Sequence, residues 1–279
     1  MNQLLLVKYM SLASRQLGSP TEALEFLEKQ RNKIKDAESA RDAYVFTTVE
    51  VAHYKLQIQN KQDECKKLLD EAEKLLESLT TTDVSTNAIF YRVSADYFKV
   101  KMQYPQYYHN ALLFLSSVQL SNISEREQQE RAYELAISAL LGDGLYNFGE
   151  LLQHPILDAL QGTSFNWLRD LLFCYNTGNL DGFDKIVKTS EFLKEKLLVN
   201  SLESLRQKLC LMTLMESVFK RSKESRGAVT FDDISKETRV SSNVVEHLVM
   251  KALSLGLVKG YIDEVDKVVQ FTWVQPRVL

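Results

Sequence analysis

Apolar residues recur at helical spacing along most of the first 200 residues, and this pattern predicts an almost entirely α-helical segment. One break lies at Gly18-Ser19-Pro20, where Ser19 and Glu22 have the spacing of a capping box and Pro20 takes the first helical position. Small residues followed by bulky apolar ones recur at 23–27, 72–76 and 111–115, as in paired helices that pack on their neighbours. We therefore predict a tetratricopeptide-like helical-repeat arm over residues 1–105.

Shorter helices and then one long helix are predicted in the middle of the chain. A helix over about 201–222 has apolar residues along one face and leads toward the C-terminal part, so we expect it to be a shared spine. Residues 220–227 carry no bulky apolar side chain and are typical of a flexible joint. We assign 106–226 to a helical part and 227–279 to a separate subdomain.

The pattern changes in the last fifty residues. Thr230 or Asp232 can cap a short helix, and a second helix begins after Ser241 and ends at Gly256. Two strand-like runs, 258–263 and 268–274, then flank a turn of hairpin length. The order helix, helix, hairpin is that of a winged-helix subdomain. The fold class expected for the chain is mainly α, a helical arm followed by this small mixed subdomain.

The hairpin predicts an exposed sheet edge. In winged-helix topology the last strand lies between the first hairpin strand and a short strand at 228–230, and Val269, Phe271 and Trp273 would face the helices. The first hairpin strand is then an edge whose backbone groups another chain can pair with. The candidate protein interface is Val258, Lys259, Gly260, Tyr261 and Ile262. The alternative, that Lys259 and Gly260 protect this edge from pairing, stays open.

Composition and charge narrow the classes of partner. The chain is 45% apolar and 25% charged, as in ordinary globular proteins, with a net charge of −3 at pH 7. It therefore lacks the broad attraction of a basic protein for phosphate backbones or anionic membranes. The three cysteines are few, odd in number and far apart, which favours buried thiols in a reducing compartment. No apolar run approaches the roughly 20 residues of a membrane span, so we expect a soluble protein of the cytoplasm and nucleus.

Motifs that carry catalysis are not found. Gly142-x-Gly144 with Gly149 follows a predicted helix, where a dinucleotide loop requires a strand. The four histidines are far apart, and none has a second histidine or a cysteine at metal-ligand spacing. There is no P-loop and no nucleophile elbow. We expect no catalytic residue, no cofactor, no metal and no small-molecule substrate.

DNA binding is the best-known use of a winged helix, and the charges disfavour it here. From residue 230 to the end there are six basic against seven acidic side chains, and the exposed face of the second helix offers one firm cation, Lys251. Phosphate contacts supply most nonspecific affinity, so no nucleic acid partner is expected. A winged-helix protein of another complex with a nucleic-acid-binding role is the alternative.

Several stretches resemble a known family. A helical arm that runs through a long helix into an acidic winged helix is similar to the PCI domain, a scaffold module of the proteasome lid, the signalosome and translation initiation factor 3. Within it, the resemblance is to the family of proteasome non-ATPase regulatory subunit 13. The stretches that carry it are 127–132, 140–142, 147–152, 154–155, 246–250, 256–260, 262–265 and 272–277.

This resemblance implies a noncatalytic scaffold subunit of the 26S proteasome regulatory-particle lid, which supports ubiquitin-dependent degradation. The implied partners are other lid PCI subunits, joined side by side through their winged helices. Family members have further helical residues before the position of Met1 and a C-terminal helix after the Gln-Pro-Arg segment. We therefore expect a truncated chain or the ordered part of a longer one. The lid's metal-dependent deubiquitinase belongs to other subunits.

Overall fold

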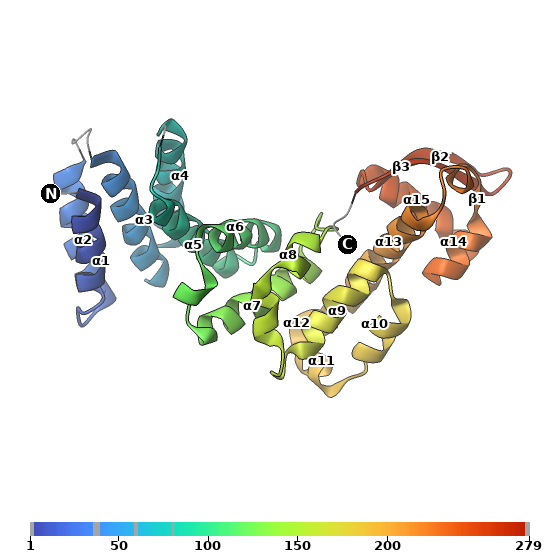
Figure 1. Cartoon of the computed structure of the whole chain (residues 1–279), viewed down its shortest axis with the longest axis horizontal. Coiled ribbons are helices and arrows are strands. Elements are labelled where there is room, and N and C mark those ends of the chain that lie inside the picture. Colours follow the sequence, from blue (N-terminus) through green and yellow to red (C-terminus); the bar gives the residue numbers. More distant parts are fainter. Residues whose placement is uncertain (1–2, 36–39, 59–60, 80, 277–279) are drawn as a thin grey trace. The chain divides into compact units, whose positions relative to one another are not determined.

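The computed structural model describes residues 3–35, 40–58, 61–79 and 81–276. They are mainly helical, with one small sheet, which confirms the predicted fold class (Figure 1). The chain packs as two compact units, Met1–Ser124 and Glu125–Leu279. The three domain ranges predicted from the sequence stay a prediction. Among the described residues no helix combines the length and the apolar character needed to cross a membrane.

The first unit is a series of helices, each packed against a neighbour in the chain. They are α1 (Gln3–Ser14), α2 (Pro20–Ile34), α3 (Arg41–Gln57), α4 (Gln62–Ser78), α5 (Val84–Val100), α6 (Tyr104–Ser117) and the 3-10 helix η2 (Leu120–Asn122). Ser19 Oγ accepts a hydrogen bond from the Glu22 N–H, as the predicted cap requires. Helix α3 is central, because it contacts α1, α2, α4 and α5 and every residue from Ala43 to Ala52 is buried.

Polar contacts link the helices of this unit. Arg31 of α2 donates to both carboxylate oxygens of Glu71 on α4 at 2.8 Å, and to the Tyr44 hydroxyl on α3 at 2.9 Å. Glu50 of α3 is 1% exposed and accepts a hydrogen bond from Ser11 Oγ of α1 at 2.5 Å. Burial alone would raise the pKa of Glu50, but the nearby His53 ring, whose Nδ1 lies 3.9 Å from the carboxylate, and the hydrogen bond from Ser11 outweigh it and lower the pKa. Glu50 is therefore a charged residue that links α3 to α1 through the hydrogen bond from Ser11.

The second unit is built around one long helix, α13. It contains α7 (Glu125–Leu141), α8 (Gly149–Gln153), η3 (Pro155–Leu160), α9 (Asn166–Thr177), α10 (Leu180–Ile186), α11 (Ser190–Lys194), α12 (Lys196–Asn200), α13 (Leu202–Lys220), η4 (Ser225–Gly227), β1 (Val229–Thr230), α14 (Phe231–Thr238), α15 (Ser242–Ser254), β2 (Val258–Asp263) and β3 (Val268–Val274). Helix α13 packs on α9, α10 and α12, and also on α14, α15 and β3 (Figure 1). The predicted spine is confirmed.

A buried lysine on α13 holds the end of α7. Lys208 is 8% exposed, and its Nζ donates to the carbonyl oxygens of Ala139, Leu140 and Gly142 at 2.7, 3.1 and 2.8 Å. The ammonium group also lies 5.3 Å from the centroid of the Phe148 ring. These carbonyls lie at the C-terminal end of α7 and have no N–H donor within the helix, so the Lys208 ammonium group supplies one. Burial lowers the pKa of Lys208 to about 7, against the opposing effect of Asp143.

Residues 220–227 are tied to α13 rather than free of it. The Arg226 side chain donates to the carbonyl oxygens of Val218 and Phe219, both at 2.7 Å. It thereby caps the last turn of α13, where carbonyl groups lack helical partners. Arg226 thus folds the segment back onto the helix, and the flexibility expected of this segment stays a prediction.

The winged helix forms as the pattern predicts, except at one strand position. The antiparallel sheet has the order β1-β3-β2, which confirms the central last strand, and Thr230 Oγ1 rather than Asp232 caps α14. Lys259 pairs with Trp273 and Gly260 with Phe271, so β3 carries one extra residue, a β-bulge. Beyond the bulge Val274 is buried and Trp273 is 38% exposed. The prediction that Trp273 packs on the helices is wrong because the bulge reverses the alternation.

Candidate protein interface

Strand β2 lies at the edge of the sheet, and it contains all five predicted interface residues. Its only strand partner among the described residues is β3. Lys259 and Tyr261 are exposed, Gly260 and Ile262 are partly buried, and Val258 is buried. The structure therefore places all five residues together on one edge. Lys259 and Tyr261 present their side chains to solvent, whereas the other three present mainly backbone groups. That this edge binds a protein stays a prediction.

Hydrogen bonds show which backbone groups of β2 turn toward β3. The Leu257 carbonyl accepts from the Gln275 N–H at 2.8 Å, and the Lys259 carbonyl accepts from Thr272 Oγ1 at 3.2 Å. Backbone groups alternate in direction along a strand. Tyr261 therefore also turns toward β3, while the N–H and C=O of Gly260 and Ile262 turn outward.

A hydrogen bond between β3 and the start of α14 supports the same assignment of backbone directions in β2. The Lys267 carbonyl accepts from the Phe231 N–H at 2.9 Å, so Lys267 turns toward the β1 side of the sheet. By alternation Val268 and Gln270 turn toward β2, and Gln270 is the partner of Tyr261. The outward N–H of Ile262 is therefore a donor that a strand from another chain can pair with.

Two exposed aromatic residues lie beside this edge. Tyr261 is 73% exposed, and Trp273 presents 38% of its surface with Lys259 Nζ 5.2 Å from its ring centroid. Large aromatic side chains are enriched among the residues that dominate binding energy at interfaces. Trp273 was missed from the sequence as an interface residue, because strict alternation assigns it to the core. Gly260 was the available signal, since a glycine within a strand often marks a bulge.

The remaining candidate residues have structural roles. Burial raises the pKa of Cys65 to about 12 and also raises the pKa of Cys174 and Cys210, so all three thiols resist ionisation. His154 Nδ1 accepts from the Ile156 N–H at 3.1 Å and caps η3. No group of three or more His, Cys, Asp or Glu side chains within the described ranges is arranged to hold a metal ion. Arg277, one of the basic residues counted above, lies outside the described residues.

Helices that lead through α13 into a winged helix are the arrangement of a PCI-type protein, and residues 179–273 match the family model described as PCI domain. Residues 1–172 match the model described as PSD13 N-terminal repeats. The chain belongs to the PSD13 family of 26S proteasome regulatory subunits.

Three curated relatives align along the whole chain. The probable 26S proteasome regulatory subunit rpn9 of Schizosaccharomyces pombe is 43% identical over 278 residues, which cover 100% of this chain and 71% of the relative. The 26S proteasome non-ATPase regulatory subunit 13 homolog B of Arabidopsis thaliana is 37% identical over 282 residues, 100% of this chain and 72% of the relative. The 26S proteasome regulatory subunit RPN9 of Saccharomyces cerevisiae is 37% identical over 290 residues, with the same coverage.

Proposed function

We propose that this chain is a noncatalytic scaffold subunit of the 26S proteasome regulatory-particle lid. It binds other PCI subunits through its winged helix and so supports ubiquitin-dependent degradation in the cytoplasm and nucleus. Support comes from the relatives described above, which are named as 26S proteasome regulatory subunits. The observation that carries the mode of binding is the outward-turned backbone of β2 between Gly260 and Ile262, beside the exposed Tyr261 and Trp273 rings.

The physical basis is β-augmentation. A neighbouring chain that adds a strand to β2 gains main-chain hydrogen bonds at the edge, and contacts with Tyr261 and Trp273 select which chain binds. The outward-turned groups belong to Gly260 and Ile262, and a Cβ atom at Gly260 would lie 2.1 Å from the Gln270 carbonyl oxygen. Ile262 is therefore the position at which the outward N–H can be tested by substitution.

A nucleic-acid-binding role has less support. The exposed side of α15 carries Lys251 and His247, but Glu246 lies on the same helix and the hairpin turn presents Asp263, Glu264 and Asp266. Acidic groups at the wing repel the phosphates that a winged helix normally contacts. Fluorescence anisotropy with a labelled duplex at low and at physiological salt separates the two functions. We expect no salt-dependent binding.

Co-purification tests the proposed function. The tagged full-length protein, isolated from its own cells at physiological salt, is analysed by mass spectrometry with a tag-only control. We expect the other PCI subunits of the proteasome lid in near-equal amounts. Recovery of the protein without any proteasome subunit contradicts the proposal.

A further inference from the structure

The solvent face of β2 carries a short row of side chains with unlike charges at its two ends. Lys259, Tyr261 and Asp263 are all exposed, and they lie on one face because side chains alternate along a strand. Lys259 and Asp263 lie about 13 Å apart along the strand, at about 3.3 Å per residue. Toward the hairpin turn the row therefore reads positive, aromatic, negative.

Lys259 supplies the positive end of this row without a counter-charge. Its Nζ lies 5.2 Å from the centroid of the Trp273 ring. Among the residues that the structure describes, no carboxylate forms an ion pair with it. The face of an aromatic ring attracts an ammonium group but does not neutralise its charge. The charge of Lys259 is therefore available to a strand that lies beside β2.

The negative end of the row lies at the hairpin turn. Asp263 Oδ1 accepts hydrogen bonds from two backbone N–H groups of the turn at 3.0 and 3.1 Å, which hold the carboxylate in place without a cation. Glu264 and Asp266 are exposed beside it. Lys267 is the one cation of this turn, and its Nζ lies 5.9 Å from the Phe231 ring, on the β1 side of the sheet. The β2 side of the turn therefore keeps its negative charge.

A strand that pairs with β2 meets this row of side chains at close range. The N–H and C=O groups of Gly260 and Ile262 turn outward, so these two residues take the hydrogen-bonded positions. Lys259, Tyr261 and Asp263 then take the alternate positions, where the Cα atoms of an antiparallel partner are only about 4.5 Å away. Opposite charges and aromatic pairs stabilise such cross-strand neighbours, and like charges destabilise them. The row can therefore select a partner by the order of its charges.

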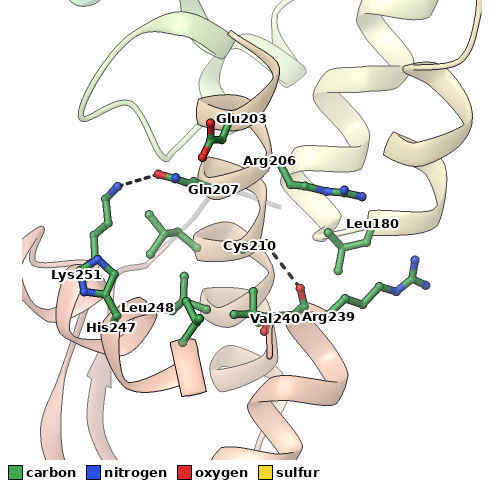
Figure 2. A pocket seen from close by; sticks show the side chains of 13 residues that line it. Leu180, Glu203, Arg206, Gln207, Cys210, Arg239, Val240, His247, Leu248 and Lys251 are labelled. Atoms are coloured by element: carbon green, nitrogen blue, oxygen red, sulfur yellow. Dashed lines mark hydrogen bonds between the residues drawn. The ribbon is translucent and has the colours of Figure 1, made fainter. Parts of the chain in front are cut away.

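The groove between α13 and α15 offers no such selection. It encloses about 380 Å³, and Figure 2 shows Lys251 on one side of it and Leu180 and Arg239 on the other, with Cys210 between them. Its arginines are paired with aspartates of α10, and Glu203 offsets Lys251. Because charges of both signs are mixed within this one groove, they favour no particular partner.

We propose that the strand added to β2 is antiparallel and complements this row. On its exposed face it carries a basic residue beside Asp263, an aromatic or β-branched residue beside Tyr261 and an acidic residue beside Lys259. Read from its N-terminus, it is basic-x-aromatic-x-acidic. The antiparallel direction follows from the greater stability of that ladder per residue. This inference rests on the proposed function, because it names the chemistry of the PCI subunit that binds the same edge.

The probe is a fluorescein-labelled hairpin peptide of about 16 residues, closed by an Asn-Gly turn and a terminal disulfide so that its strands form before binding. One strand reads Thr-Lys-Val-Tyr-Val-Glu-Thr. The other strand carries proline at its outward positions, so that only the first can pair. The control hairpin peptide exchanges the lysine and the glutamate, and its composition and net charge are therefore the same. Binding to the purified chain is followed by fluorescence anisotropy.

We expect the first hairpin peptide to bind at least about fivefold more tightly than the exchanged one, which places like charges beside both Lys259 and Asp263. In Lys259→Glu we expect this preference to fall below about twofold, because the acidic end of the peptide then meets a like charge. A third hairpin peptide with lysine at both ends should bind this variant more tightly than the first does. Lys251→Glu, at an exposed position of α15, is the matched control and should keep the full preference.

Three results overturn the proposal. They are binding of the exchanged hairpin peptide that equals or exceeds that of the first, a preference that Lys259→Glu leaves unchanged, and no binding of the first up to about 1 mM. NMR gives a second readout, in which the amide signals of Gly260 and Ile262 should shift with the first hairpin peptide; unshifted signals would show that it does not bind β2. The hairpin peptides contain no lid sequence, so their failure leaves co-purification with lid subunits untouched. Absence of lid subunits in that experiment likewise leaves the charge preference measurable.

Discussion

Lys259 Nζ lies 5.2 Å from the centroid of the Trp273 ring, on the opposite strand of the hairpin. The ring is 38% exposed, so its removal exposes less apolar surface than removal of a core aromatic residue. We expect Trp273→Ala to lower the free energy of unfolding by about 1–2 kcal/mol, below the 3–5 kcal/mol typical of a fully buried ring. Urea denaturation measures this change in the free energy of unfolding. A loss above about 4 kcal/mol would show that the ring belongs to the core.

Gly260 is required where β2 meets the bulge. A Cβ atom at this position would lie 2.1 Å from the carbonyl oxygen of Gln270, which is backbone and has little freedom to move. We expect Gly260→Ala to lower the free energy of unfolding by about 1–3 kcal/mol, as overpacking does. Gly227→Ala is the control, since a Cβ atom there meets nothing within 4 Å. Equal stability of the two variants would exclude the clash.

Lys208 is predicted to stabilise the second unit by satisfying three carbonyl groups at the end of α7. Lys208→Met fills similar space without a donor, and a buried acceptor left unpaired costs about 1–3 kcal/mol. We expect a loss of about 2–4 kcal/mol in chemical denaturation, because some of the carbonyls regain partners by relaxation. Lys251→Met, at an exposed position, is the control. Equal stability of Lys208→Met and the wild type would contradict this role.

The same lysine makes stability depend on pH. In the folded chain burial lowers the pKa of Lys208 to about 7 from its ordinary value of 10.5. Between these values the unfolded chain binds more protons than the folded chain, so stability rises with pH. From pH 7 to pH 9 we expect the wild type to gain on the order of 2 kcal/mol over Lys208→Met. If the free energy of unfolding of the wild type and of Lys208→Met changed with pH in parallel, the proposed effect of Lys208 would be ruled out.

Glu50 also makes the free energy of unfolding rise with pH, but in the acid range. Burial would raise its pKa, but the neighbouring His53 ring and the hydrogen bond from Ser11 leave the folded pKa below the ordinary value of 4.5. The stability that Glu50 contributes is present above pH 4.5 and is lost as the pH falls through the folded pKa. We expect Glu50→Gln to remove this part of the acid sensitivity. The check is a series of thermal melts from pH 6 down to pH 3, in which an unchanged slope would contradict it.

The helix caps and the individual strands could be predicted from the sequence because they depend on neighbouring residues, and the strand order follows from winged-helix topology. Thr230, the turn before Val268 and the alternation around Phe271 all act within a few positions, and the predicted elements follow them. The side-chain direction at Trp273 could not be predicted, because it depends on one extra residue in the pairing of β3 with β2. Gly260 indicates a bulge but does not fix which strand carries it.

The groove and the buried lysine could not be predicted for a different reason. Leu180, Cys210 and Lys251 come from three helices and are far apart in the sequence, so no local pattern joins them. Lys208 is charged, so the sequence predicts that its side chain is solvated. In the structure it is buried, because the end of α7 supplies three carbonyl acceptors for its ammonium group.

Pairing of another PCI subunit with the β2 edge is tested most directly by substitution of Ile262. Ile262→Pro and Ile262→Ala both remove the side chain, but only proline removes the outward N–H on which an added strand depends. Both variants are titrated with the subunit that co-purifies with the wild type, after circular dichroism has shown the same fold. We predict at least about tenfold weaker binding of Ile262→Pro than of Ile262→Ala. Equal affinity of the two variants would contradict pairing at this edge.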